Sequence, residues 1–129
     1  MRTMQREQSA NELRTVNTED DIQGVLGALD DVDCRAIIKA ISDTALSAHE
    51  LSKSCNIPLS TTYRKLDVLT EAGLLEEGTR IRLSGKHTSE YSWNIEEVVI
   101  SVSTNEGIEL QVKPRKPPEH YPVSLTVQG

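Results

Sequence analysis

Apolar residues recur at spacings of three and four in four stretches of the chain, which predicts four helices. The first two helices are expected over about residues 19–29 and 33–42, and the third over residues 47–55. The fourth stretch, residues 58–72, has the most regular apolar face. It ends before Gly73, which suits a helix C-terminus with positive φ.

Capping residues precede three of these helices. Thr18 stands before the first helix, and Asp31 or Asp33 stands before the second. Ser47 and Glu50 form a regular capping box at the start of the third, because each side chain can accept from the other residue's backbone amide. These signals fix where the helices are expected to begin.

After Gly73 the pattern changes to the alternation that is typical of strands. Residues 74–84, which alternate in their second half, and residues 90–95, which alternate throughout, predict a hairpin whose tip is residues 85–89. A second hairpin is expected over residues 98–112, with its turn at residues 103–107. One face of it carries six apolar side chains: Val98, Ile100, Val102, Ile108, Leu110 and Val112.

Three helices followed by a two-stranded wing are the parts of a winged helix, so the predicted fold class is α+β. The chain is expected to divide into a mobile segment (1–17), a winged helix-turn-helix domain (18–96) and an extension (97–129). The extension would hold the second hairpin, a stiff Pro-rich connector and a terminal strand with the sequence VSLTV.

A family resemblance supports this organisation. The run SAHELSKSCNIPLSTTYRKLDVLTEAGLLEE resembles the helix-turn-helix core of ArsR-type regulators. The runs VLGALDDVDCRAIIKAIS and STTYRKLDVLTEAGLL resemble winged-helix regulators that are common in salt-loving archaea. The resemblance covers about residues 20–96, and it implies a transcriptional regulator that binds double-stranded DNA.

The candidate DNA-binding residues lie on the fourth helix and on the wing. A recognition helix meets bases in the major groove through its N-terminal half. On this helix the candidates are Ser60, Thr61, Tyr63, Arg64 and Lys65. The wing, predicted over residues 80–90, would contact adjacent phosphates or the minor groove through Arg80, Arg82, Lys86 and His87. Any one of these side chains also suits an ordinary solvated surface, so the prediction rests on the set.

The net charge of −6 argues against a simple nucleic-acid binder, because phosphate contacts need cations. Residues 56–95 nevertheless carry five Lys and Arg against five Asp and Glu, so the least acidic region coincides with the predicted DNA-binding surface. The excess of acids resembles that of proteins from cells with molar internal salt, where repulsion from DNA is screened. We therefore expect DNA binding to persist in molar KCl.

The sequence carries no sign of catalysis. It holds no nucleophile motif, Gly-rich phosphate loop or HExxH run, so we expect neither an enzyme nor a cofactor or small-molecule ligand. Cys34 and Cys55 lie on inward helix faces without a CxC or CxxC pair, and His49, His87 and His120 are isolated. We therefore predict no metal site.

Targeting signals are also missing from the pattern. No apolar stretch approaches the roughly 20 residues that cross a bilayer, and the N-terminus lacks the apolar middle region of a secretory signal. We expect a cytoplasmic protein without a membrane partner.

A homodimer is expected, because specific DNA binding usually requires two half-sites that are read by a two-fold dimer. The apolar face of the second hairpin is the predicted interface, since a two-stranded hairpin is not stable alone. Two alternatives stay open. One is a protein-binding winged helix in a transcription or chromatin complex, which the acidic ends favour, and the other is a metal or redox sensor that uses Cys34 or Cys55.

Overall fold

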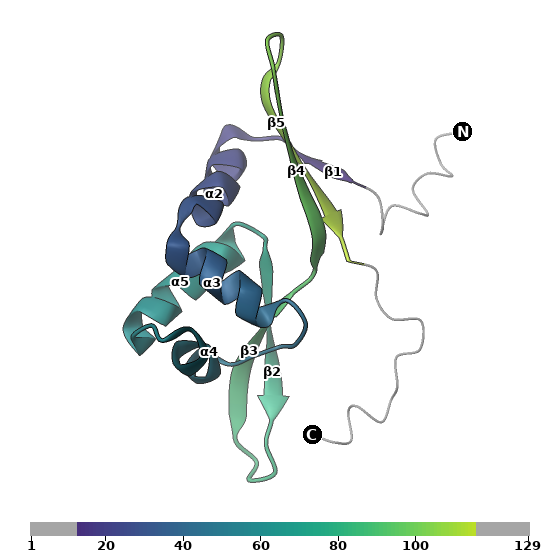
Figure 1. Cartoon of the computed structure of the whole chain (residues 1–129). Coiled ribbons are helices and arrows are strands. Elements are labelled where there is room, and N and C mark those ends of the chain that lie inside the picture. The colour runs from purple at the N-terminus through teal and green to yellow at the C-terminus, as the bar shows by residue number, and fades with distance from the viewer. Residues whose placement is uncertain (1–12, 116–129) are drawn as a thin grey trace, which may run out of the picture.

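The computed structural model describes residues 13–115, in which four helices form one body and two hairpins extend from it (Figure 1). In chain order the elements are β1 (Arg14–Val16), α2 (Glu19–Asp30), α3 (Val32–Ile41), α4 (Ala48–Cys55), α5 (Leu59–Glu71), β2 (Leu75–Ile81), β3 (His87–Trp93), β4 (Ile95–Ser103) and β5 (Gly107–Pro114). The four predicted helices and two predicted hairpins are confirmed.

The helix termini follow the predicted caps. Thr18 accepts from the amide of Asp21, and the cap of α3 is Asp31 rather than Asp33. The capping box of Ser47 and Glu50 is complete at the start of α4. Gly73 has a φ of 80° after α5, as a helix C-terminus of this kind requires.

The core lies between the helices and the bases of the two hairpins. Ile37 of α3, Leu51 of α4 and Leu66 and Leu69 of α5 are completely buried in it. Thr62 is the polar member of the α5 face, and its hydroxyl donates to the carbonyl of Pro58 at 3.0 Å. Burial of this face fixes which side of α5 remains exposed.

The wing is the antiparallel pair β2 and β3, and its tip differs from the prediction. Pairing runs from Leu75↔Trp93 to Ile81↔His87, so residues 87–89 belong to β3. The turn is instead residues 82–86, where the amide of Gly85 donates to the carbonyl of Arg82 at 2.8 Å. Gly85 has a φ of 90°, which suits the turn itself rather than its first position, and this shifts the tip towards the N-terminus.

The second hairpin, β4 and β5, has its turn where the sequence predicts it, between Ser103 and Gly107. Val98 pairs with Val112, Ile100 with Leu110 and Val102 with Ile108, which puts all six apolar side chains on one face. A third strand joins this hairpin to form a sheet, and it was not predicted, because residues 1–17 were expected to be mobile. Residues 14–16 form β1 on the edge of β5, where Val16 packs against the core. The expectation is therefore wrong for these three residues.

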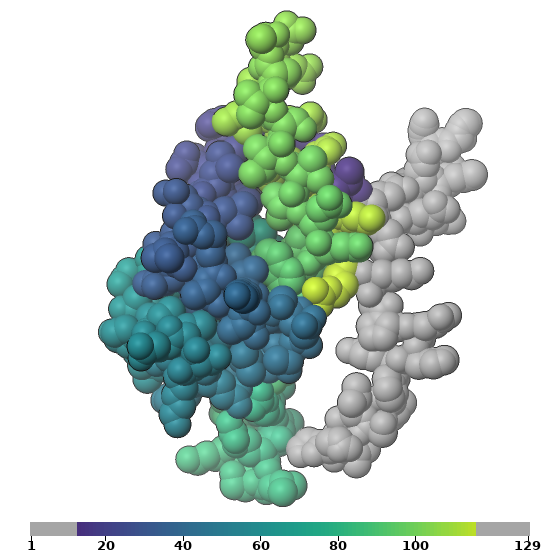
Figure 2. Space-filling view, in the orientation of Figure 1, coloured from purple at the N-terminus to yellow at the C-terminus, as the bar shows by residue number. Residues whose placement is uncertain are grey.

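The base of this hairpin belongs to the domain core. Leu110 is completely buried, and Val98 and Val112 are half-buried against the same core. The expected boundary between residues 96 and 97 therefore does not separate two cores, and Leu110 is removed from the predicted dimer interface. Beyond the base, the hairpin rises past the helices (Figure 2) and Ile100, Val102 and Ile108 are exposed.

The predicted Pro-rich connector begins later than expected. Lys113 and Pro114 lie in β5 and pair with β4, and Arg115 follows the strand, whereas residues 116–129, which include the VSLTV segment, lie outside the described residues. Within residues 13–115 no helix has the length and hydrophobicity that crossing a bilayer requires.

Candidate nucleic-acid interface

The N-terminal half of α5 presents most of the predicted recognition residues to solvent. Ser60, Tyr63 and Arg64 are exposed and Thr61 is half-buried, because Thr62 and Leu66 hold the opposite face in the core. No acid occurs in the first turn of this helix. An anion can therefore approach the helix N-terminus, where the macrodipole favours it.

Lys65, in contrast, is turned towards the protein. Its Nζ lies 2.9 Å from Oδ1 of Asp31, and its side chain is only 18% exposed. The hydrogen bond from Lys65, followed by that from the amide of Cys34, lowers the pKa of Asp31. Lys65 thus ties α5 to the start of α3, and it is left out of the DNA surface proposed below.

Arg80 is also held by carboxylates. Its Nε lies 2.8 Å from Glu90 on β3, and its terminal nitrogens each lie 3.2 Å from a carboxylate oxygen of Glu50 on α4. These hydrogen bonds raise the pKa of Arg80, and they lower the pKa of Glu50 to about 2. Arg80 links α4 to the wing and neutralises acids beside the candidate surface. The ion pairs with Glu50 and Glu90 account for an arginine at this position without the predicted contact with DNA.

The wing tip carries the remaining cations. Arg82, Lys86 and His87 are exposed, and Nε of Arg82 donates to Thr88 at 3.1 Å. Residues 79–89 hold Arg80, Arg82 and Lys86 and no acid. Two apolar residues near the tip do not pack against the core: Ile81, at the end of β2, is 54% exposed, and Leu83, in the turn, is 97% exposed.

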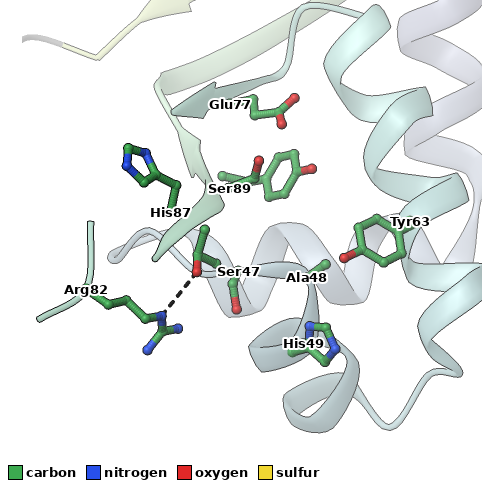
Figure 3. A pocket seen from close by; sticks show the side chains of 10 residues that line it. Ser47, Ala48, His49, Tyr63, Glu77, Arg82, His87 and Ser89 are labelled. Carbon is green, nitrogen blue, oxygen red and sulfur yellow. Dashed lines mark hydrogen bonds between the residues drawn. The ribbon is translucent and has the colours of Figure 1, made fainter. Parts of the chain in front are cut away.

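A groove of about 460 Å³ lies between the start of α4, α5 and the wing (Figure 3). It brings Tyr63 of α5 together with Arg82 and His87 of the wing, three of the predicted residues. His49 also lines the groove, although it was not among the DNA-binding residues predicted from the sequence. In this view Glu77 lies at the end of the groove away from His49. Only the fold shows that the start of α4 faces the wing.

The cysteines are placed as core residues. Burial raises the pKa of the Cys34 thiol to about 11, and it also raises the pKa of Cys55, whose Sγ donates to the carbonyl of Ala36. A thiol with a raised pKa forms little of the reactive thiolate at neutral pH. Among residues 13–115, no group of three or more His, Cys, Asp or Glu side chains could hold a metal ion.

A family model matches the part of the chain that holds the helix-turn-helix. Residues 29–78, which span α3 to α5 and the start of the wing, match a family model described as a helix-turn-helix domain. The fold is a winged helix-turn-helix. A solved structure described as a possible transcriptional regulator from Methanosarcina mazei Go1 is similar at 21% identity and a TM-score of 0.45, over 72% of this chain and 78% of that one. No curated protein matches the chain.

Proposed function

We propose that this winged helix-turn-helix protein binds double-stranded DNA in a sequence-specific manner and regulates transcription as a homodimer. The observation that carries the proposal is the distribution of charge. In a chain of net charge −6, residues 59–66 of α5 and residues 79–89 of the wing contain no acid, and three of their cations, Arg64, Arg82 and Lys86, make no ion pair among residues 13–115. These two segments also border the same groove.

The recognition helix α5 would read bases in the major groove. Arg64 makes no ion pair within residues 13–115, so its guanidinium donors remain available for a guanine edge or a phosphate. Ser60 and Thr61 lie in the first turn, where their hydroxyls and the backbone amides suit a phosphate oxygen.

The wing would lie on the adjacent backbone or in the minor groove. Arg82, Lys86 and His87 suit phosphates. The exposed Leu83 lies between Arg82 and Lys86 in the sequence of the tip. Apolar side chains at such positions contact the walls of the minor groove or wedge between base steps. Lys65 and Arg80 support this surface from within the protein.

The experiment is a fluorescence-anisotropy titration of the full chain against a target fragment selected from genomic DNA and a shuffled fragment. We expect the selected fragment to bind at least tenfold more tightly. The double variant Arg64→Ala/Arg82→Ala should lose this preference, whereas Arg14→Ala, on β1 and outside the surface, should keep it. Equal binding of selected and shuffled DNA at every KCl concentration would refute site-specific recognition.

A protein-binding winged helix remains the second candidate, because the first turn of α2 carries Glu19, Asp20 and Asp21 on an exposed surface. Such an acidic face suits a basic protein partner. The same titration separates the two candidates, since this second function predicts no binding to either fragment.

A further inference from the structure

β4 is an edge strand whose outer side has no partner in residues 13–115. The sheet order is β1-β5-β4, so β5 is the only described neighbour of β4. Along the nine residues of β4, every second residue directs its backbone N–H and C=O groups to this outer side. The exposed part of the strand lies beyond its anchored base, where Ile100 is 46% and Val102 is 74% exposed.

This edge lacks the features that normally prevent strands from associating. Natural edge strands are protected by Lys, Pro, bulges or inward-pointing charges. Residues 98–103 have the sequence VVISVS, with three valines, an isoleucine and no charge. The irregularity in pairing lies between Ile95 and Glu97, outside this run. An uncharged, β-branched edge of this kind is predicted to be covered by another strand.

We infer that β4 pairs in antiparallel orientation with β4 of a second copy of the chain, so that two three-stranded sheets join into one sheet of about six strands. The inference rests on the proposed homodimeric function and specifies how the two subunits associate. The hairpin tip and the wing tip lie at opposite ends of the molecule (Figure 1), so pairing along β4 leaves the wing uncovered.

Symmetry restricts the register. A two-fold axis perpendicular to the sheet keeps the same face of both copies on the same side. Val98, Ile100 and Val102 must therefore lie opposite members of the same apolar set in the second copy. Pairing Ile100 with Ile100 of the second copy places Val98 opposite Val102. It also centres the uncharged run and places Glu97 opposite Ser103 rather than opposite another carboxylate.

Self-pairing therefore satisfies the edge in two ways. The backbone groups of β4 gain partners, and each exposed apolar side chain gains an apolar neighbour on the same face. A second copy of the chain fits this edge. Residues 98–103 are uncharged and apolar, so the same run in another copy offers a strand of matching character without charge repulsion.

The test is site-specific crosslinking of the full chain in a Cys55→Ser background. Ile100→Cys would lie directly across the axis from its copy, at about 4.5–5.5 Å between Cα atoms, which suits a disulfide. Ile108→Cys is the matched control, because Ile108 is also 46% exposed on the same face but lies on β5. The two β5 strands would be three strand spacings apart, or about 14 Å.

We expect mild oxidation to link most of the Ile100→Cys chains into dimers and almost none of the Ile108→Cys chains. Sedimentation should show the parent as a dimer at high micromolar concentration and Val102→Lys as a folded monomer. Crosslinking of both cysteine variants would indicate packing between faces and would overturn edge pairing. A monomeric parent, or a dimer in which Ile100→Cys does not link, would overturn it equally.

DNA binding separates this inference from the proposed function. If Val102→Lys is monomeric and binds one half-site weakly, both stand. If Ile100→Cys crosslinks but the parent binds no DNA, edge pairing stands and the proposed function fails.

Discussion

At the scale of single residues, the partners of each cation decide what it can do. Arg64 and Lys65 are neighbours on α5, yet Arg64 is exposed and unpaired within residues 13–115, whereas Lys65 contacts Asp31. On the wing, Arg82 extends from the tip while Arg80 is held between Glu50 and Glu90. Position along the chain does not show which cation of each two is free to bind DNA, but the contacts of their side chains do.

The neighbours Arg64 and Lys65 should therefore respond in opposite ways to substitution. Arg64→Ala should leave stability unchanged and weaken specific DNA binding by about 1–3 kcal/mol. Lys65→Ala should instead destabilise the fold by about 1 kcal/mol, because it leaves the half-buried Asp31 without its partner, and it should affect binding much less. Urea unfolding and anisotropy titrations measure both quantities. If Lys65→Ala weakens binding as much as Arg64→Ala at full stability, our division of the cations is wrong.

Leu66 should make a large contribution to stability. It is completely buried beneath α5, so Leu66→Ala should destabilise the protein by about 2–5 kcal/mol through loss of contacts and a residual cavity. Val68 on the same helix is 39% exposed and provides the control, since Val68→Ala should cost less than about 1 kcal/mol. Thermal unfolding of the two variants checks the helical phase, and a parent-like melting temperature for Leu66→Ala would contradict it.

At the scale of elements, one guanidinium joins α4 to the wing by charge. Arg80 holds Glu50 at the start of α4 and Glu90 on β3, so these elements are joined by charge as well as by packing. Glu50 also completes the capping box with Ser47. A substitution that removes the charge but keeps the cap isolates the contribution of this link.

Glu50→Gln is that substitution, because glutamine can still accept from the amide of Ser47. The folded pKa of Glu50 is lowered from 4.5 to about 2, so its ionised form stabilises the fold above pH 4.5. This contribution is lost as the pH falls from 4.5 towards 2. We expect Glu50→Gln to be less stable than the parent at pH 7 by at most about 1 kcal/mol, since the Glu50 side chain is 42% exposed.

Urea unfolding at several pH values between 7 and 3 measures this difference. The stabilities of parent and Glu50→Gln should converge as the solution is acidified. A difference that stays constant over this range would show that the Glu50 charge contributes nothing to the fold.

The sequence predicted local elements better than long-range contacts. The helices were predictable because caps such as Ser47 and apolar spacing such as that of Leu66 and Leu69 act within a few residues. The pairing of β1 with β5 joins segments about a hundred residues apart, and three residues carry too short a pattern to reveal it. The contact of Lys65 with Asp31 spans 34 residues in the same way. The exposed cations of the proposed DNA-binding surface could therefore be picked out from the sequence, whereas the ion pairs of Lys65 and Arg80 could not.

At the scale of the whole molecule, an acidic protein is proposed to bind an acidic polymer, so the dependence of binding on salt is informative. Of the five cations in residues 59–66 and 79–89, Arg64, Arg82 and Lys86 remain for phosphates, because Lys65 and Arg80 are paired internally. The net charge of −6 adds repulsion that salt screens, which flattens the dependence further.

Each phosphate contact contributes about −0.9 to the slope of log K against log[salt], so we expect a slope no steeper than about −2.7 per subunit. Five contacts would give about −4.5. Anisotropy titrations between about 0.1 and 1 M KCl, over which the Debye length falls from about 10 Å to about 3 Å, measure this slope. A slope near −4.5 per subunit would mean that Lys65 and Arg80 leave their carboxylates for phosphates. Loss of all specific binding in molar KCl would contradict the adaptation to high salt that the excess of acids suggests.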